Sequence, residues 1–188
     1  MCGSRLLIEV NVVLKMFLPD EHVHSIFEIR PDDLKEKGIK GIITDLDNTL
    51  VAWDQRDATK EVEQWFKLMQ ENDIQVTIMS NNNEERVTSF SEPLNIPFIY
   101  SARKPLGQAF RQARKVMKLD KKEIVVVGDQ LLTDVLGGNR ANLYTILVVP
   151  IVQTDGVLTR INRKVERRLL SFFQRKGYIS WEEERWKK

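Results

Sequence analysis

The sequence predicts an α/β fold, a doubly wound parallel sheet with helices on both faces. Apolar runs of strand length alternate along the chain with stretches whose apolar residues recur at helical spacing. The first clear strand, an apolar run from Ile39 to Ile43, ends abruptly in Asp45 and Asp47. Open sheets of this class bind ligands at the carboxyl ends of their strands, so these acids mark a candidate site.

Length and composition favour one domain with an appended tail, since 188 residues can bury a proper core. The single cysteine, Cys2, excludes an internal disulfide and suits a reducing compartment. No apolar run reaches the roughly 18 residues of a membrane span. The net charge of +2 argues against wholesale nucleic-acid binding. We therefore expect a cytoplasmic protein with no nucleic-acid partner.

Residues 1–37 are interpreted as an N-terminal extension and lead-in. Met16 is an alternative start to Met1, which would make residues 1–15 an upstream extension. His22 and His24 are interpreted as a surface pair, because no cysteine or third histidine supports a metal site.

Residues 38–153 are predicted to form the catalytic domain, and its elements follow in order. A helical turn precedes it, with Pro31 at its start and Gly38 just past its end. After the first strand, the pattern predicts a helix over 58–69 with Asp57 as N-cap. A second strand over 74–79 follows.

The remainder of this domain alternates in the same way. The pattern predicts helices over 84–90 and 106–117, and strands over 98–100, 123–127 and 144–149. Gly137 and Gly138 indicate a close or flexible backbone before the last strand.

Chemically capable side chains follow four of these strands at one predicted edge. They are Asp45, Asp47, Ser80, Lys104, Asp129 and Asp134. The acids require an oxygen-preferring cation, and Mg²⁺ fits two or three carboxylates. The lysine and the hydroxyl fit a substrate phosphate. One carboxylate can attack phosphorus, and a second can protonate the leaving oxygen and then activate water.

In these motifs the chain resembles the haloacid dehalogenase (HAD) superfamily of phosphatases. The resemblance covers roughly 38–153 and rests on Asp45-Leu46-Asp47-Asn48-Thr49, Ser80, Lys104, and Gly128-Asp129 with Asp134. It implies a Rossmann-like sheet, with Asp45 as nucleophile and Asp47 as general acid/base. It also implies Mg²⁺ held by the Asp45 and Asp129 side chains and the Asp47 backbone carbonyl.

The same resemblance assigns the remaining site residues. Ser80 and Lys104 would bind the phosphoryl group, and Asp134 would support the metal shell or Lys104. Asn81 and Thr49 are further candidates for binding phosphate.

A closer resemblance is to the YqeG-type group of subfamily IIIA, related to mitochondrial phosphatidylglycerophosphate phosphatases. It rests on Phe17-Leu18-Pro19-Asp20, the stretch from Ile39 to Asp54, Ser80-Asn81-Asn82, Arg103-Lys104-Pro105 and the stretch from Gly128 to Gly138. It implies phosphatidylglycerophosphate as substrate. Because the segments between the motifs hold no cap domain, we expect an open site that suits a bulky or surface-borne phosphate.

Three alternatives stay open at the level of the sequence. The substrate could be a soluble sugar or nucleotide phosphate. The chain could instead be a phospho-acceptor signalling domain, although receiver domains place their acidic pair before the acceptor aspartate, whereas Asp45-x-Asp47 comes first here. It could also be a scaffold without turnover. The oligomeric state is open as well.

The tail, 154–188, predicts a basic amphipathic helix. Its apolar stripe consists of Leu158, Ile161, Val165, Leu169, Phe172 and Phe173. Around it lie Arg160, Arg163, Lys164, Arg167, Arg168, Arg175 and Lys176, with Glu166 as the single acid. We favour packing of the stripe on the domain. The alternative is peripheral contact with the inner face of an anionic membrane, for which Trp181 and Trp186 would be anchors.

Overall fold

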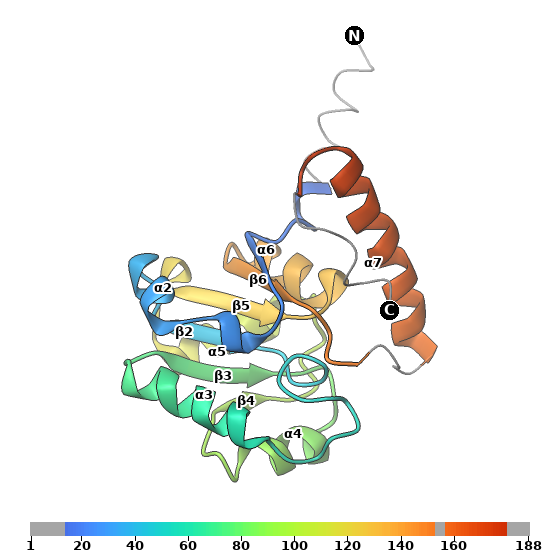
Figure 1. The fold of residues 1–188 in the computed structure, drawn as a ribbon. Helices are drawn as coiled ribbons and strands as arrows, with labels where there is room; N and C mark the ends of the chain where they lie inside the picture. The colour runs from blue at the N-terminus through green and yellow to red at the C-terminus, as the bar shows by residue number, and fades with distance from the viewer. Residues whose placement is uncertain (1–13, 153–156, 180–188) are drawn as a thin grey trace.

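The computed structural model describes residues 14–152 and 157–179, and within them it has one all-parallel sheet of six strands (Figure 1). In spatial order the strands are β1 (Glu21–Val23), β6 (Tyr144–Val148), β5 (Ile124–Gly128), β2 (Gly41–Thr44), β3 (Gln75–Met79) and β4 (Phe98–Ile99). The predicted α/β class is confirmed.

The two central strands, β2 and β5, end at the same level. Thr44 is paired with Val127, and the backbone N–H of Asp45 donates to the Val127 carbonyl at 2.9 Å. The residue that follows each strand therefore emerges at one edge of the sheet, which positions Asp45 beside Asp129.

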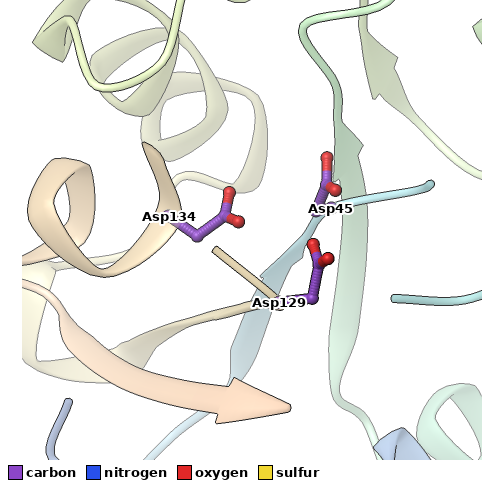
Figure 2. Close-up of side chains that lie close together, drawn as sticks. All are labelled: Asp45, Asp129 and Asp134. Atoms are coloured by element: carbon purple, nitrogen blue, oxygen red, sulfur yellow. The ribbon is translucent and has the colours of Figure 1, made fainter. Parts of the chain in front are cut away.

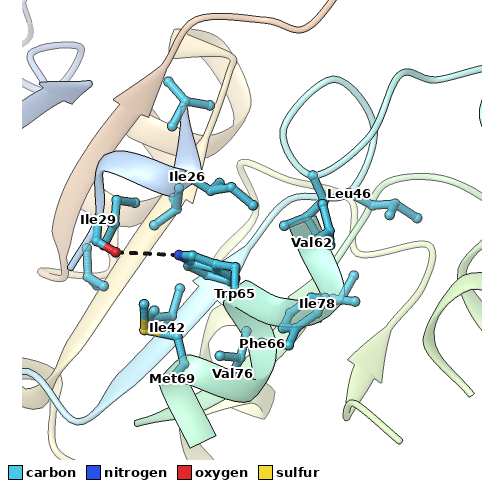
Figure 3. Close-up of a cluster of buried hydrophobic side chains, with 14 of the residues drawn as sticks. Ile26, Ile29, Ile42, Leu46, Val62, Trp65, Phe66, Met69, Val76 and Ile78 are labelled. Atoms are coloured by element: carbon cyan, nitrogen blue, oxygen red, sulfur yellow. Dashed lines mark hydrogen bonds between the residues drawn. The ribbon is translucent and has the colours of Figure 1, made fainter. Parts of the chain in front are cut away.

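One face of the sheet is covered by η1 (Ile26–Glu28), α2 (Pro31–Glu36), α3 (Lys60–Glu71) and α4 (Glu84–Ser91). Figure 3 shows the centre of this core, where Trp65 and Phe66 of α3 pack edge to face with centroids 5.4 Å apart. The indole Nε1–H donates to the Ile29 carbonyl at 3.4 Å. This contact ties α3 to the N-terminal lead-in.

The other face is covered by α5 (Gly107–Met117), with η2 (Lys121–Glu123) leading into β5, and then by η3 (Leu131–Val135), α6 (Leu136–Arg140) and α7 (Val157–Arg175). The structure gives the predicted close backbone at the glycine pair a physical reason. A Cβ on Gly137 would lie 2.5 Å from Phe110, and one on Gly138 would lie 2.5 Å from Thr145.

Two local expectations differ from the structure. Asp57 is not the N-cap of α3; Thr59 is, and its side chain accepts the Val62 N–H at 3.2 Å. Strand β1 was not predicted at all. It is only three half-buried residues long, and it forms because β6 lies alongside it, with the Asp20 carboxylate accepting the Thr145 N–H at 2.8 Å.

Helix α7 packs on the domain with a face that shares Leu169, Phe172 and Phe173 with the predicted stripe but is rotated away from Val165. Among the side chains of α7 that the structure describes, Glu166, Leu170 and Phe173 are buried, whereas Val165 is 42% exposed. Leu170 and Phe173 pack with Leu131, Val135 and Leu147, and with Phe17 of the lead-in. Glu166, expected among the solvated charges, therefore points inward.

Some predictions lie outside the described residues. These are residues 1–13 of the upstream extension predicted over 1–15, the tail residues Trp181 and Trp186, and the side chains of Leu158, Arg160, Ile161 and Arg163. Within the described parts of the chain, no helix combines the length and apolarity that a bilayer span requires.

Candidate active site

Three carboxylates converge at the carboxyl edge of the sheet. Asp45 follows β2, Asp129 follows β5, and Asp134 lies in η3 (Figure 2). One oxygen from each lies within 4.8 Å of the others, and the residues are only 8%, 1% and 2% exposed. Buried acids this close repel one another, so the arrangement requires positive charge.

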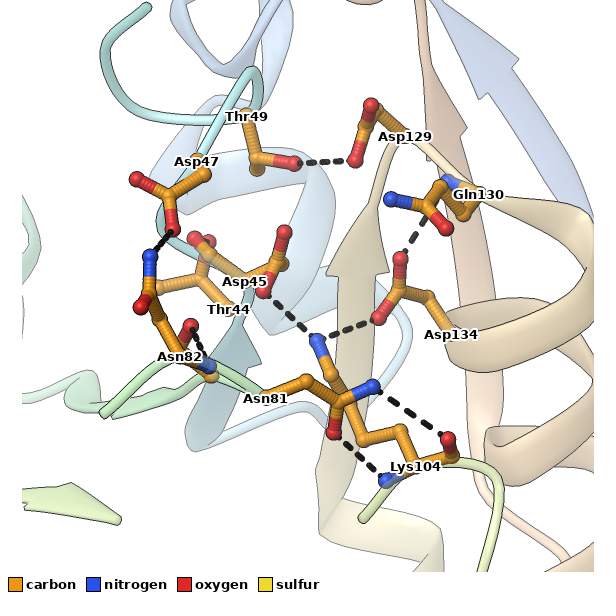
Figure 4. Close-up of polar contacts among 11 residues, drawn as sticks. Thr44, Asp45, Asp47, Thr49, Asn81, Asn82, Lys104, Asp129, Gln130 and Asp134 are labelled. Carbon is orange, nitrogen blue, oxygen red and sulfur yellow. Dashed lines mark hydrogen bonds and ion pairs between the residues drawn. The ribbon is translucent and has the colours of Figure 1, made fainter. Parts of the chain in front are cut away.

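Lys104 supplies part of that charge. Its Nζ lies 2.6 Å from an oxygen of Asp45 and 2.6 Å from an oxygen of Asp134 (Figure 4). Asn81 fixes the lysine backbone from both sides, accepting the Lys104 N–H at 2.7 Å and donating to its carbonyl at 3.3 Å. The lysine therefore reaches the acids from a loop that is itself held to the end of β3.

The electrostatics of these groups leave a deficit of positive charge. Burial raises the pKa of the Asp45 carboxyl to about 8, Lys104 opposes this, and Asp134 and Asp129 add to it. Burial alone would lower the pKa of Lys104, but Asp134 and Asp45 outweigh burial and raise it. With every group ionised, three carboxylates and one ammonium leave two negative charges, which one divalent cation would balance.

Ser80 lies at the end of β3 and is buried. Its Oγ accepts the Asn82 N–H at 3.0 Å, which leaves the hydroxyl proton for an acceptor in the pocket. Asn83 then caps α4 by accepting the Arg86 N–H at 2.9 Å. The turn-favouring residues after β3 thus start the helix that borders the site.

Asp47 points to α4 rather than to the acid cluster. Its Oδ1 lies 3.1 Å from Arg86 Nε and 2.9 Å from Nη2, and its Oδ2 accepts the Asn82 amide at 3.1 Å. Arg86 also donates to the Arg56 carbonyl and lies over the Phe90 ring, 5.7 Å from its centroid. Arg86 was not among the predicted site residues; its place in the first helical turn after Ser80 was the available signal.

Thr49 lies beside the acids instead of on the pocket wall. Its hydroxyl donates to Asp129 at 3.3 Å, and it is buried. Its loop turns back on itself through Asn48, which has φ +64° and whose N–H donates to the Val51 carbonyl at 2.7 Å. Thr49, a candidate for binding phosphate, is thus placed to orient a carboxylate.

A pocket of about 340 Å³ opens above these groups. Of the predicted residues, Asp45, Asp47, Ser80, Asn81 and Lys104 line it, while Thr49, Asp129 and Asp134 are buried and are not on its wall. The pocket is also lined by residues that were not predicted as site residues: Asn48, Trp53, Asn82, Gln130 and Thr133. Trp53 is 48% exposed and also borders a neighbouring pocket of about 300 Å³.

The donor set fits a hard divalent cation, because it is built from carboxylate oxygens and carries the matching charge. The two oxygens of Asp134 are already engaged, by Lys104 at 2.6 Å and by the Gln130 N–H at 3.2 Å. This favours a role for Asp134 in placing the lysine. The site thus combines a pair of acids whose oxygens fit a cation, a lysine and a hydroxyl beside one open pocket, which is a set suited to phosphoryl transfer.

Comparisons with known proteins agree with this chemistry. A HAD-hydrolase-like family model matches residues 101–161. The chain is 63% identical over 169 residues to the probable phosphatase YqeG of Bacillus subtilis (strain 168), spanning 90% of this chain and 98% of that protein. It is 29% identical over 197 residues to phosphatidylglycerophosphate phosphatase 1, chloroplastic/mitochondrial, of Arabidopsis thaliana, spanning 93% of this chain and 56% of that protein.

One solved structure supports the fold alone. The cobalt-bound deoxy-D-mannose-octulosonate 8-phosphate phosphatase (YrbI) of Haemophilus influenzae superposes with a TM-score of 0.51 at 17% identity. The match covers 73% of this chain and 90% of that one.

Proposed function

Because this chain belongs to the YqeG-type phosphatases of the haloacid dehalogenase superfamily and is a phosphoric monoester hydrolase, we propose that it acts through an aspartyl-phosphate on Asp45 with Mg²⁺ as cofactor. The observation that carries this proposal is the group of buried carboxylates beside Lys104, of which Asp45 lines an open pocket together with the lysine. A receiver or scaffold role has no support from the relatives, which are named as phosphatases.

Both half-reactions of the proposed mechanism use Asp45 and Asp47. A carboxylate oxygen of Asp45 attacks phosphorus, and the bond between phosphorus and the ester oxygen breaks. Asp47, protonated and turned from Arg86 and Asn82 toward the pocket that it lines, gives a proton to that oxygen, and the alcohol leaves. Asp47 then removes a proton from water, the water oxygen attacks phosphorus, and the bond to Asp45 breaks. Inorganic phosphate is released, and both carboxyl groups return to their starting states.

The other residues hold the phosphoryl group and its charge. Lys104 and the Ser80 hydroxyl face the pocket and neutralise or donate to phosphoryl oxygens, assisted by Asn81. Asp45 and Asp129, with the Asp47 carbonyl, would hold Mg²⁺. When bound, this ion supplies the positive charge that offsets the phosphoryl oxygens.

The substrate proposed is phosphatidylglycerophosphate. The relationship to the plant enzyme of that name supports it, as does the open pocket, since only α3 and β3 lie between the Asp47 loop and Ser80. The exposed face of α7 carries Lys164, Arg167, Arg168 and Arg175, and Lys176 follows it. These charges support peripheral contact with an anionic bilayer, where such a substrate resides.

The test is Mg²⁺-dependent phosphate release from phosphatidylglycerophosphate in mixed micelles, with soluble sugar and nucleotide phosphates in parallel. We expect release to prefer the lipid, to stop with EDTA, and to stop in Asp45→Asn, which keeps the shape of the side chain. Release from soluble esters alone would retain the mechanism and reject the lipid. Wild-type rates in Asp45→Asn would reject the nucleophile. Sedimentation with phosphatidylglycerol vesicles tests membrane contact, and Arg167→Glu with Arg168→Glu should abolish it.

A further inference from the structure

Helix α7 contains a buried acid that the reaction described above does not use. Glu166 is 3% exposed, whereas Lys164, Arg167, Arg168 and Arg175 of the same helix are all exposed. A carboxylate costs several kcal/mol to bury unless polar groups compensate it. Glu166 shares the buried side of α7 with Leu170 and Phe173, so its polar contacts decide whether this burial is tolerated.

The carboxylate reaches across to the backbone of η3. Its Oε1 accepts the Leu132 N–H at 3.1 Å. Leu132 is the second residue of η3, where N–H groups have no partner within the helix and are normally capped by the residue before it. That residue, Gln130, makes no side-chain cap. Glu166 supplies from another helix the cap that η3 does not make for itself.

The capped segment borders the candidate site and carries two of its residues, Thr133 and Asp134. Asp129 precedes it, Thr133 lines the pocket, and Asp134 holds Lys104. It is wound as a π-helix, a conformation that is rare, usually short and often found at functional sites. Contacts that fix this segment therefore bear on the geometry of the site.

Two backbone N–H groups of this segment are fixed by carboxylates. Asp134 Oδ2 accepts the Gln130 N–H at 3.2 Å. Glu166 Oε1 accepts the Leu132 N–H at 3.1 Å. The apolar sides of Leu131 and Val135 pack against α7. The tail helix thus holds the turn that sets the distance between Asp129 and Asp134.

We propose that Glu166 is a positioning residue of the phosphatase: its hydrogen bond to the Leu132 N–H fixes η3 so that Asp129 and Asp134 face Asp45 and Lys104 in the geometry that cation binding and turnover require. This inference rests on the proposed function for its catalytic consequence, but its structural consequence can be measured without it. Helix α7 is accordingly part of the active-site architecture, whatever its outer face contacts.

The test compares three substitutions in the full chain. Glu166→Gln keeps an acceptor oxygen of the same reach, and Glu166→Leu removes it. Leu169→Ala is the matched control, because it weakens the packing of α7 in the same cluster without touching Leu132. Glu166→Ala, which admits water to the Leu132 N–H, is the milder second variant should the leucine variant fail to fold.

The first readout is amide hydrogen exchange in metal-free protein, without substrate. The Gln130 amide reports on Asp134, since that carboxylate accepts it. We expect exchange at Leu132 and Gln130 to rise about tenfold in Glu166→Leu, with the amides of β2 unchanged, and to stay near wild type in Glu166→Gln. Unchanged exchange at Gln130 in Glu166→Leu would overturn the proposal.

The second readout is Mn²⁺ binding by electron paramagnetic resonance, followed by kcat and KM. Loss of an outer contact of this kind typically costs 10–100-fold in metal affinity or activity, so we expect Glu166→Leu to bind Mn²⁺ at least about tenfold more weakly and to lose kcat with little change in KM. Leu169→Ala should lose stability alone. Equal losses in Leu169→Ala, or no rescue by Glu166→Gln, would reduce Glu166 to a packing residue. Failure of the wild type to bind Mn²⁺ or release phosphate would contradict the proposed function, and the exchange result would still decide the inference.

Discussion

Replacing Lys104 by methionine tests whether the acid cluster depends on this one cation. The ammonium lies 2.6 Å from both Asp45 and Asp134, and all three side chains are almost fully buried. Lys104→Met keeps much of the side-chain volume but leaves the two acids without their partner. Breaking a buried pair in this way costs about 3–5 kcal/mol. In a chain of this size that corresponds to a fall in Tm of roughly 6–20 °C.

The decisive comparison is a double-mutant cycle with Asp134→Asn. The asparagine Oδ1 can still accept the Gln130 N–H that Asp134 accepts at 3.2 Å, so the single change removes charge with little loss of shape. Because Lys104→Met and Asp134→Asn remove the two ends of one interaction, the double variant should be more stable than the sum predicts by at least about 1 kcal/mol.

The assay is urea unfolding monitored by circular dichroism and fluorescence. EDTA is present so that no bound cation masks the loss of stability. A coupling energy within about 0.5 kcal/mol of zero would mean that Lys104 and Asp134 act independently. The 2.6 Å contact between Lys104 and Asp134 would then contribute no coupling energy. The inference that a cation balances the charge of this cluster would fail with it.

Three further predictions follow from the same geometry. Burial raises the pKa of Asp45 to about 8, so ionising this carboxyl costs more in the folded than in the unfolded state, and in EDTA the wild type should lose stability as the pH rises from about 4 to 8. In urea titrations across this pH range, Asp45→Asn should reduce the dependence of the free energy of unfolding on pH. An equal dependence in the variant would refute the raised pKa of Asp45. Gly128→Ala places a Cβ 2.3 Å from Asp134, so it should lower kcat at least about tenfold with the circular dichroism spectrum retained, whereas Gly107→Ala, which meets only a flexible arginine tip, should not. Trp65→Phe loses ring packing and a hydrogen bond, and should cost about 1–3 kcal/mol in urea unfolding without changing kcat; an altered kcat would show that this core contact reaches the site.

The convergence of Asp45, Asp129 and Lys104 could be predicted from sequence because parallel strands deliver their carboxyl ends to one edge. The strand pattern located β2 and β5, and in a parallel sheet the residue after each strand lies at the carboxyl edge. The role of Asp134 was open between the cation and the lysine. Its two hydrogen-bonding partners, which depend on how η3 is wound, favour the lysine.

What the sequence did not predict depends on contacts between distant segments. In the sequence, Arg86 is an ordinary charged residue of a helix, and its contact with Asp47 depends on the packing of α4 beside the Asp47 loop. Glu166 sits among arginines and was interpreted as solvated, because periodicity in a helix with many charges does not fix its rotation to within one residue. Strand β1 has no periodic pattern in three residues, and its existence is decided by β6.

The pairing of β1 with β6 has a consequence for the order of events during synthesis. Val23 leaves the ribosome about 125 residues before Val148, its partner in the sheet. At typical elongation rates this interval is on the order of 10 s. The nascent chain therefore carries Asp45, the proposed nucleophile, early but lacks Asp129, Asp134 and strand β6 until much later in synthesis. The growing polypeptide is thus exposed to chaperones and proteases long before it can act on any ester.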